Sequence, residues 1–367
     1  MTQPSDETYI AARADFLDAV GAAGARIRSW QHPLRGRHDE ALFLDVAEVG
    51  PVGATSLVAV VSGTHGAECI EGSRLQRRHL RETRLASMLD TAGVCLVFVH
   101  AFEPFGASWT READDDNVDL NRNFIDRIGP PPANPDYDEY ADSIVPPRWD
   151  VASEAHAVAA LYGALAELGP LEFQALIARG QYDHPRGLFY GGLGPTWSHR
   201  WLLDWIADRW AGLRRAAVID VRTGLGEWGV VERAGVGAPD ASDVVTSRAQ
   251  SWWPDLRTRG DDRSVLTEIV GEWLPALDGL APEVEITSVS LECGVSDPAR
   301  ALLALRAETW WHMVGDRRSA EAEQARSLLR AAYVADDPAW TAAVWPVYLD
   351  TVDAAVRGLS EGAVGAA

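Results

Sequence analysis

The sequence is poor in the features that mark secreted or membrane-spanning proteins. Its 367 residues include only three cysteines, Cys69, Cys95 and Cys293, too few for a disulfide framework. No apolar run reaches the length of a transmembrane helix. The opening stretch MTQPSDETYIAARADF has neither the basic start nor the apolar segment of a signal peptide. We therefore expect a reduced, cytoplasmic protein without membrane contact.

Positive charge is also scarce: the chain has 33 Lys and Arg residues but 54 Asp and Glu residues, which gives a formal net charge of -21. Nucleic acid and anionic membranes require a basic face, so we expect neither as a partner. The acidity favours solubility. An anionic ligand would have to be bound by local arginines against the field of the whole protein.

Apolar runs of the buried-strand type alternate with helical patterns along the chain. Strands are predicted at 40–49, 56–62, 92–101, 171–180, 216–222 and 283–294. Helices are predicted at 5–24, 70–89, 151–168, 196–212, 264–279 and, as three segments, over 297–357. Such alternation predicts an α/β fold with an open, mainly parallel sheet and helices on both faces. We expect one domain over 1–367, with a frayed tail at 360–367, a long irregular stretch at 106–150 and an insertion at 229–250.

The motif SGTHGAECIEGS places His65 and Glu68 three residues apart, directly after a buried strand. This spacing can aim an imidazole and a carboxylate at one divalent cation, because residues three apart on a helical turn share a face. A purely structural pair is the alternative interpretation.

Two arginines stand out in the acidic stretch that follows the strand 92–101. In DDDNVDLNRNF, Arg122 with the neighbouring amide of Asn121 suits bidentate recognition of a carboxylate. Alternatively, Arg122 offsets the acids at 114–116 in a solvated loop. Arg111, in SWTREADD, could stabilise an oxyanion or lie on the surface among acids.

Two further motifs follow predicted strands. Glu292, in SLECGVSD, would be costly to bury unpaired, so it has either a structural partner or a role in acid–base chemistry. The glycine-rich stretch GQYDHPRGLFYGG, 180–192, lets the backbone approach a ligand closely and contains His184, the best-placed additional imidazole.

In chain order, HGAE, FEPFGASWTR, NVDLNRNF, IDVRTGLG and LECG resemble the zinc carboxypeptidases. More closely, the chain is similar to an uncharacterised bacterial subgroup of that superfamily known only as a domain of unknown function. The resemblance covers about residues 10–355. It implies a carboxypeptidase-like fold, a mixed, mainly parallel sheet of about eight strands, and a hydrolase that cleaves an amide or peptide bond next to a carboxylate. The implied substrate is a small peptide or amide with a free carboxylate.

The resemblance also implies roles for particular residues. His65 and Glu68 match two of the three zinc ligands, and Glu292 matches the glutamate that activates the zinc-bound water. Zinc would lower the pKa of that water, and Glu292 would carry its proton to the leaving amine.

The substrate side of the site is implied in the same way. Asn121 and Arg122 match the pair that holds the terminal carboxylate of the substrate. Arg111 lies near the arginine that stabilises the tetrahedral oxyanion, although its spacing to Asn121 is shorter than in the family.

One position departs from the family pattern. The third zinc ligand is a histidine in the sequence Ile-Asp-x-His-Thr-Gly, and this chain has Arg222 there. Arginine stays protonated and has no lone pair for a metal. The two remaining ligands are fewer than the three that a catalytic zinc site keeps.

Three interpretations follow. Arg222 could pair with Glu68 and replace the charge of the metal; His184 could supply the third ligand; or Arg222 could turn away from a weakened site completed by water. The function implied is therefore a zinc hydrolase with an altered metal site, in which zinc depends on a third ligand. The alternative is a metal-free pseudoenzyme, or a protein that binds a carboxylate ligand or a partner.

Overall fold

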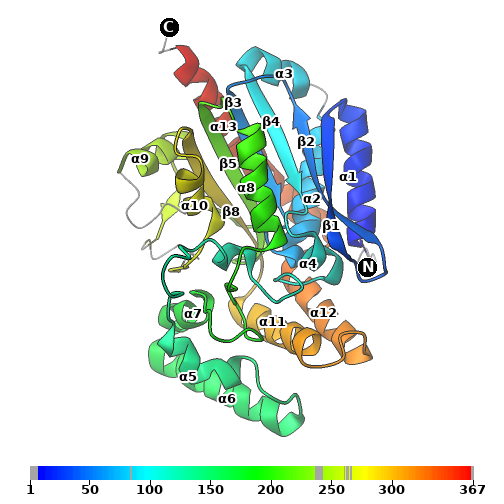
Figure 1. Cartoon of the computed structure of the whole chain (residues 1–367), viewed down its shortest axis with the longest axis vertical. Helices are drawn as coiled ribbons and strands as arrows, with labels where there is room; N and C mark the ends of the chain where they lie inside the picture. Colours follow the sequence, from blue (N-terminus) through cyan, green and yellow to red (C-terminus); the bar gives the residue numbers. More distant parts are fainter. Residues whose placement is uncertain are drawn as a thin grey trace.

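The computed structural model describes residues 7–82, 85–235, 243–259, 261, 264 and 267–364. An eight-stranded mixed sheet forms its centre, with strand order β1-β2-β4-β3-β5-β8-β6-β7 (Figure 1). The strands are β1 (Arg26–Arg35), β2 (Ala41–Val49), β3 (Ser56–Ser62), β4 (Val94–His100), β5 (Arg215–Leu225), β6 (Val231–Gly235), β7 (Arg257–Thr258) and β8 (Glu285–Ser296).

The four central strands β4, β3, β5 and β8 are parallel neighbours, so their carboxyl ends lie at one edge of the sheet. β1 and β2 extend one side in antiparallel fashion, and β6 is antiparallel to β8 on the other side. The predicted mixed, mainly parallel α/β sheet is therefore confirmed.

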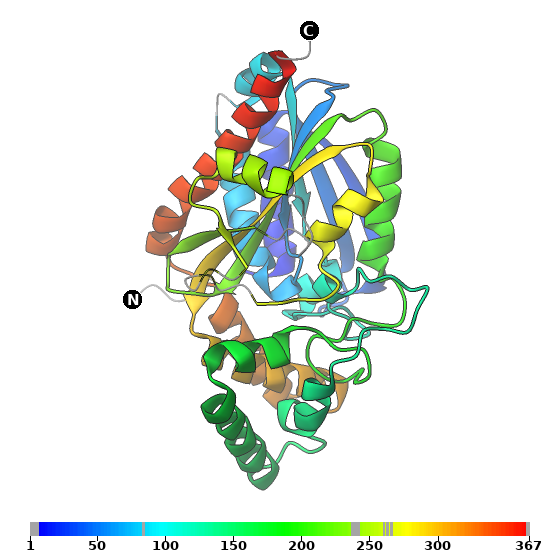
Figure 2. The same ribbon diagram turned by 90° about the vertical axis from the view of Figure 1, so that its left-hand side faces the viewer.

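Helices cover both faces of the sheet, as the turned view shows (Figure 2). Alternate residues of β3 point to opposite faces: Val58 and Val60 belong to one apolar core, and Leu57 and Ala59 to the other. The first core includes α1 (Tyr9–Ala23), α2 (Cys69–Leu80), α3 (Leu85–Ala92), α9 (Asp243–Trp252) and α13 (Pro338–Val364). The second includes α8 (Trp197–Arg209) and α10 (Trp273–Leu280).

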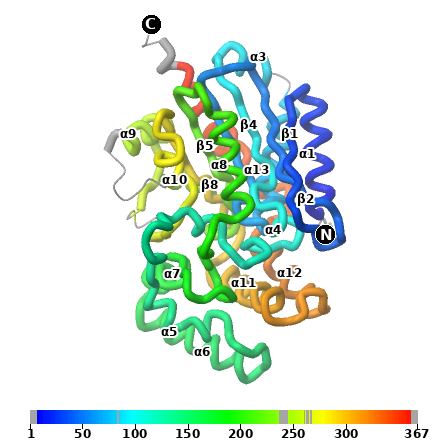
Figure 3. The backbone as a smooth tube through the Cα atoms, in the orientation of Figure 1, coloured from blue at the N-terminus to red at the C-terminus, as the bar shows by residue number. Residues whose placement is uncertain are grey.

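The remaining helices lie mainly at the lower end of the molecule, below the sheet (Figures 1 and 3). They are α4 (Pro104–Trp109), α5 (Pro135–Ile144), α6 (Val151–Leu168), α7 (Pro170–Ala178), α11 (Pro298–Met313) and α12 (Ala320–Tyr333). Two of these helices begin at residues whose side chains cap the N-terminus. The Asn134 side chain caps α5 and the Asp150 side chain caps α6, each accepting from backbone N–H groups of the first turn.

The predicted strand at 171–180 is wrong, because this segment forms helix α7. Gly169, with φ 79°, and Pro170 at the first helical position begin a helix. Only Leu176 and Ile177 are buried within it, and a short apolar run does not distinguish a strand from a helix face.

Other boundaries also differ. The predicted helix at 70–89 is two helices, α2 and α3, and the irregular stretch at 106–150 contains α5. Strands β1, β6 and β7 were not predicted. The expected tail at 360–367 lies in α13 as far as Val364, and 365–367 lie outside the described residues. Within the described chain, no helix has both the length and the apolar character needed to cross a membrane.

Candidate functional site

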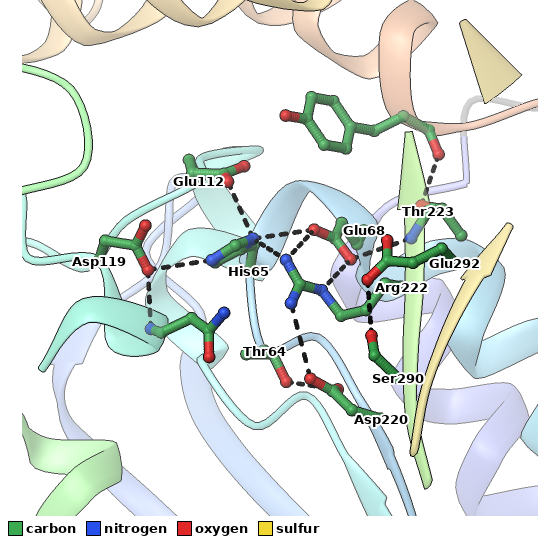
Figure 4. A network of polar contacts seen from close by, with 12 residues as sticks. Thr64, His65, Glu68, Glu112, Asp119, Asp220, Arg222, Thr223, Ser290 and Glu292 are labelled. Carbon is green, nitrogen blue, oxygen red and sulfur yellow. Dashed lines mark hydrogen bonds and ion pairs between the residues drawn. The ribbon is translucent and has the colours of Figure 1, made fainter. Parts of the chain in front are cut away.

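The site lies where the carboxyl ends of the parallel strands meet (Figure 4). His65 and Glu68 follow β3, Arg222 lies on β5, and Glu292 on β8 is the register partner of Arg222. Asp119 comes from the segment after β4. The parallel topology thus gathers motifs that are far apart in the sequence, as expected for an open α/β sheet.

A glycine allows the turn that presents His65 and Glu68. Gly66 opens the short 3-10 helix η1 (Gly66–Glu68), and a Cβ on it would lie 1.9 Å from the carbonyl carbon of Gly106. A 2.7 Å hydrogen bond from the N–H of Ala67 to the carbonyl oxygen of Arg111 holds this turn against the segment that follows Gly106. A larger residue at position 66 would displace the turn.

The Arg222 guanidinium lies against both candidate metal ligands (Figure 4). Its Nε donates to Glu68 Oε2 at 3.0 Å, and its Nη2 is 3.2 Å from Glu68 Oε1 and 2.7 Å from His65 Nδ1. Its Nη1 is 3.7 Å from Asp220 Oδ2. The backbone N–H of Thr223 donates to Glu68 Oε2 at 3.0 Å. Both carboxylate oxygens of Glu68 are therefore occupied by donors from β5.

Electrostatics favours this pairing. Burial raises the pKa of Glu68, but the Arg222 guanidinium and His65 outweigh burial and hold that pKa below its usual value. Burial lowers the pKa of Arg222, and the Glu68 and Glu292 carboxylates more than compensate, so its pKa stays well above the ordinary value. The pair is consequently ionised on both sides throughout the physiological range.

His65 is held through both ring nitrogens. Its Nε2 is 3.0 Å from Asp119 Oδ1, the kind of carboxylate contact that orients metal-binding histidines. Its Nδ1 lies 2.8 Å from Glu112 Oε1 and 2.9 Å from Glu68 Oε1. A neutral ring protonated on Nε2 accepts from Arg222 at Nδ1, whereas a protonated ring donates from Nδ1 to a carboxylate. In neither form does Nδ1 have a lone pair free for a metal ion.

These residues do not fit a zinc ion with three protein ligands. His65, Glu112 and Asp119 offer ligand atoms within 4.8 Å of one another, but Asp119 is hydrogen-bonded to Nε2 and Glu112 faces Nδ1. Arg222 adds a fixed positive charge at the same nitrogen.

His184 does not reach the site. Its Nε2 pairs with Asp138 Oδ1 at 2.8 Å, and its side chain is 35% exposed. It is absent from the residues that line the cavity described below. The structure therefore does not place His184 as a substitute third ligand, and the arrangement matches the interpretation in which Arg222 pairs with Glu68.

Glu292 faces the same centre from β8. Ser290 donates its hydroxyl to Glu292 Oε1 at 2.6 Å. Burial raises the pKa of Glu292, and the Arg222 guanidinium lowers it by less, so the pKa lies above its usual value. Glu292 can thus exchange a proton nearer to neutral pH than an exposed glutamate, and its role as a base stays a prediction.

Asn121 and Arg122 both line the cavity, as their predicted role requires. The Arg122 side chain is fixed by its Nε, which donates to the carbonyl oxygen of Ala178 at 2.9 Å. Its Nη1 donates to the Asn121 carbonyl oxygen at 3.1 Å and is 3.4 Å from Asp119 Oδ2. Within the described residues, none of its hydrogen bonds uses Nη2.

Arg111 is not brought to the cavity. It is fully buried, and its guanidinium donates to Glu308, to the Asp114 carbonyl oxygen and to Asn117 Oδ1. Its predicted contact with an oxyanion has no support from this position. The neighbouring acids are not all solvated either, because Asp114 is only 8% exposed.

Asp114 yields a prediction about pH. Burial raises its pKa to about 7. Its ionisation between its unfolded pKa and pH 7 therefore costs stability as pH rises. Asp114→Asn keeps an acceptor for the Val118 N–H. We expect its free energy of unfolding, relative to that of the wild type, to rise by about 2.5 kcal/mol between pH 5 and pH 8. Urea unfolding at both pH values measures this, and a gain that does not grow with pH would contradict it.

A cavity of about 400 Å³ opens over the site. Its floor is formed by the charged residues, among them His65, Glu112, Arg122, Arg222 and Glu292. Its walls are largely apolar and come from α6, α7 and α11.

Three acids of the site were not predicted from the sequence: Glu112, Asp119 and Asp220. Asp119 lies inside NVDLNRNF and caps the following turn by accepting from the Asn121 N–H at 2.7 Å, so its position in the motif was a usable signal. Asp220 accepts from Thr64 at 2.7 Å and from the Trp273 indole at 2.9 Å. Nothing in the sequence distinguished Glu112 from its acidic neighbours.

A family model described as "Protein of unknown function (DUF2817)" matches residues 6–346. The chain belongs to this family. A comparison with curated proteins finds no match.

Several solved structures resemble the chain at low identity. Carboxypeptidase A from Helicoverpa armigera is 12% identical, with a TM-score of 0.44 over 97% of this chain and 74% of that one. A metallo-carboxypeptidase from Burkholderia cenocepacia is 13% identical, with 0.36 over 93% and 68%. A succinylglutamate desuccinylase from Silicibacter is 13% identical, with 0.38 over 84% and 66%. At these scores the likenesses do not bear on activity.

Proposed function

We propose that this protein binds a small carboxylate-bearing ligand without a metal ion, on a scaffold resembling that of the zinc carboxypeptidases. The observation that carries the proposal is the contact of Arg222 with both Glu68 and His65. The guanidinium supplies positive charge where a dication would be expected. A site arranged in this way keeps its pocket while lacking the Lewis acid needed for hydrolysis.

Arg122 is the group that would hold the ligand carboxylate. Arg222 is already engaged by Glu68, whereas the hydrogen bonds described for Arg122 use only Nε and Nη1. Burial lowers the pKa of Arg122, and Asp119 compensates only in part. A buried cation that is incompletely compensated favours an anion beside it, and the guanidinium fork suits a carboxylate.

Hydrolysis of an amide bond next to a carboxylate is the second candidate. It is favoured by Glu292, whose raised pKa and position on the cavity suit a general base. Release of glycine from N-benzoylglycine, with and without added zinc, separates the two candidates. Turnover that requires zinc would favour the hydrolase and overturn the metal-free proposal.

Titration calorimetry with N-benzoylglycine tests the role of Arg122. We expect the acid to bind and its carboxamide analogue to bind at least about tenfold more weakly, because charge-assisted hydrogen bonds are lost. Arg122→Gln should weaken binding of the acid by at least about tenfold. Arg127→Gln, which makes the same charge change outside the cavity lining, is the matched control. Equal binding of acid and carboxamide would contradict the proposal.

A further inference from the structure

The cavity extends from its charged floor along an apolar arm. We define the arm by six side chains that line the cavity: Val158, Leu161 and Leu165 of α6, Phe173 and Ile177 of α7, and Leu302 of α11. The charged lining residues come mostly from the strand ends and the segments after β3 and β4, whereas the apolar ones come largely from α6, α7 and α11. A ligand that fills it therefore has the same division.

The arm is built by helices outside the central sheet. α6 and α7 belong to the connection between β4 and β5, and Figures 1 and 2 show them at the lower end of the molecule. Several apolar side chains of these two helices keep exposed surface. Val158, Leu165 and Phe173 are only half-buried, and Tyr162, which also lines the cavity, is 57% exposed. Apolar surface left in contact with water is stabilised when a ligand covers it.

Arg122 meets apolar lining residues at Phe189 and beside Ile177, since its Nε donates to the carbonyl oxygen of the next residue, Ala178. Phe189 and Ile177 line the cavity, and the Arg122 guanidinium lies 5.0 Å from the centre of the Phe189 ring. A chain that starts from a carboxylate at Arg122 thus enters apolar surroundings directly. No charged side chain of the described lining belongs to α6 or α7.

We infer that the ligand is an amphiphile, a carboxylate attached to a long aliphatic chain that occupies the arm. This inference rests on the proposed binding of a carboxylate and specifies the rest of the ligand. Free fatty acids and N-acylated amino acids share this chemistry. They differ in whether an amide lies next to the carboxylate, in a cavity that Glu292 and Glu112 also line.

Chain length gives the measurable consequence. Each methylene that moves from water into an apolar site tightens binding about fourfold. In a series of N-acylglycines from acetyl to dodecanoyl, we expect the Kd from titration calorimetry to fall steadily until the arm is full. Dodecanoate and dodecanol, titrated in parallel, test the amide and the carboxylate: weaker binding of dodecanoate than of the acylglycine favours the amide, and dodecanol should bind most weakly.

A variant that narrows the arm tests its location. Leu165→Trp should reduce the ratio of the Kd of N-acetylglycine to that of N-dodecanoylglycine by at least about tenfold, because the added ring displaces several methylenes. Glu167→Trp, on an exposed position of the same helix outside the cavity lining, is the control and should keep the ratio. The chain-length series on the wild-type protein does not depend on the folding of either variant.

The outcomes separate this inference from the proposed function. If short and long acylglycines bind the wild type equally, a carboxylate site exists but the amphiphile inference fails. If none of the acids binds, the proposed function itself fails. If dodecanol binds as tightly as N-dodecanoylglycine, binding is apolar only and the carboxylate part of the inference is overturned.

Discussion

Arg222→Leu should lower the free energy of unfolding by about 3–5 kcal/mol, the cost of breaking a buried ion pair. Glu68 is only 2% exposed, and the variant leaves its carboxylate with the Thr223 N–H and His65 but without a permanent positive charge. Urea unfolding monitored by tryptophan fluorescence measures the effect.

Two further variants show whether the lost stability belongs to this pair. Arg179→Leu removes an ion pair whose side chains are 40% and 60% exposed, and we expect a loss below about 1 kcal/mol. Adding Glu68→Gln to Arg222→Leu should recover part of the loss, because the unpaired charge disappears. A loss below about 1 kcal/mol for Arg222→Leu itself would mean that the pair is not stabilised as the structure indicates.

Arg222→His should create a zinc site. The substitution removes a positive charge and the Arg222 contact with Nδ1 of His65. It also places an imidazole, a neutral third ligand, beside His65 and Glu68. We expect zinc affinity to rise by at least about a hundredfold over the wild type, because supporting groups alone change it by 10–100-fold. Competition with a chromophoric chelator measures this.

Arg222→Leu is the matched control for the zinc experiment as well. It removes the same charge but supplies no ligand, so it isolates the contribution of the imidazole. If folded Arg222→His binds zinc no more tightly than Arg222→Leu, then position 222 is not the third ligand position, and the correspondence with the zinc carboxypeptidases is wrong there.

The sequence predicted the central part of the fold because its signals there are local. The runs at 56–62 and 92–101 are continuously apolar, and both are strands buried on two faces. The segment 171–180 has a shorter apolar run, ALIA at 175–178, and the pair Gly169 and Pro170 begins a helix there. Edge strand β1 lacked a continuous apolar pattern, since nearly all its residues are exposed, and was not predicted.

The candidate site was predictable to the extent that its residues belong to motifs. His65, Glu68 and Glu292 lie in short motifs at strand ends, and parallel topology brings such ends together. The failures concern long-range pairing. Arg111 pairs with Glu308, 197 residues away, and no local pattern reveals a partner at that separation.

Zinc titration of the wild-type protein tests the central claim most directly. Purified protein is stripped with a chelator, incubated with zinc, dialysed and analysed for metal by elemental analysis. If Arg222 takes the place of the metal ion, the protein should retain far less than one zinc ion per chain, because the guanidinium is bonded to both His65 and Glu68. Retention of one zinc ion per chain, lost on Glu68→Gln, would contradict this replacement of the metal by Arg222 and would favour the metal-dependent hydrolase.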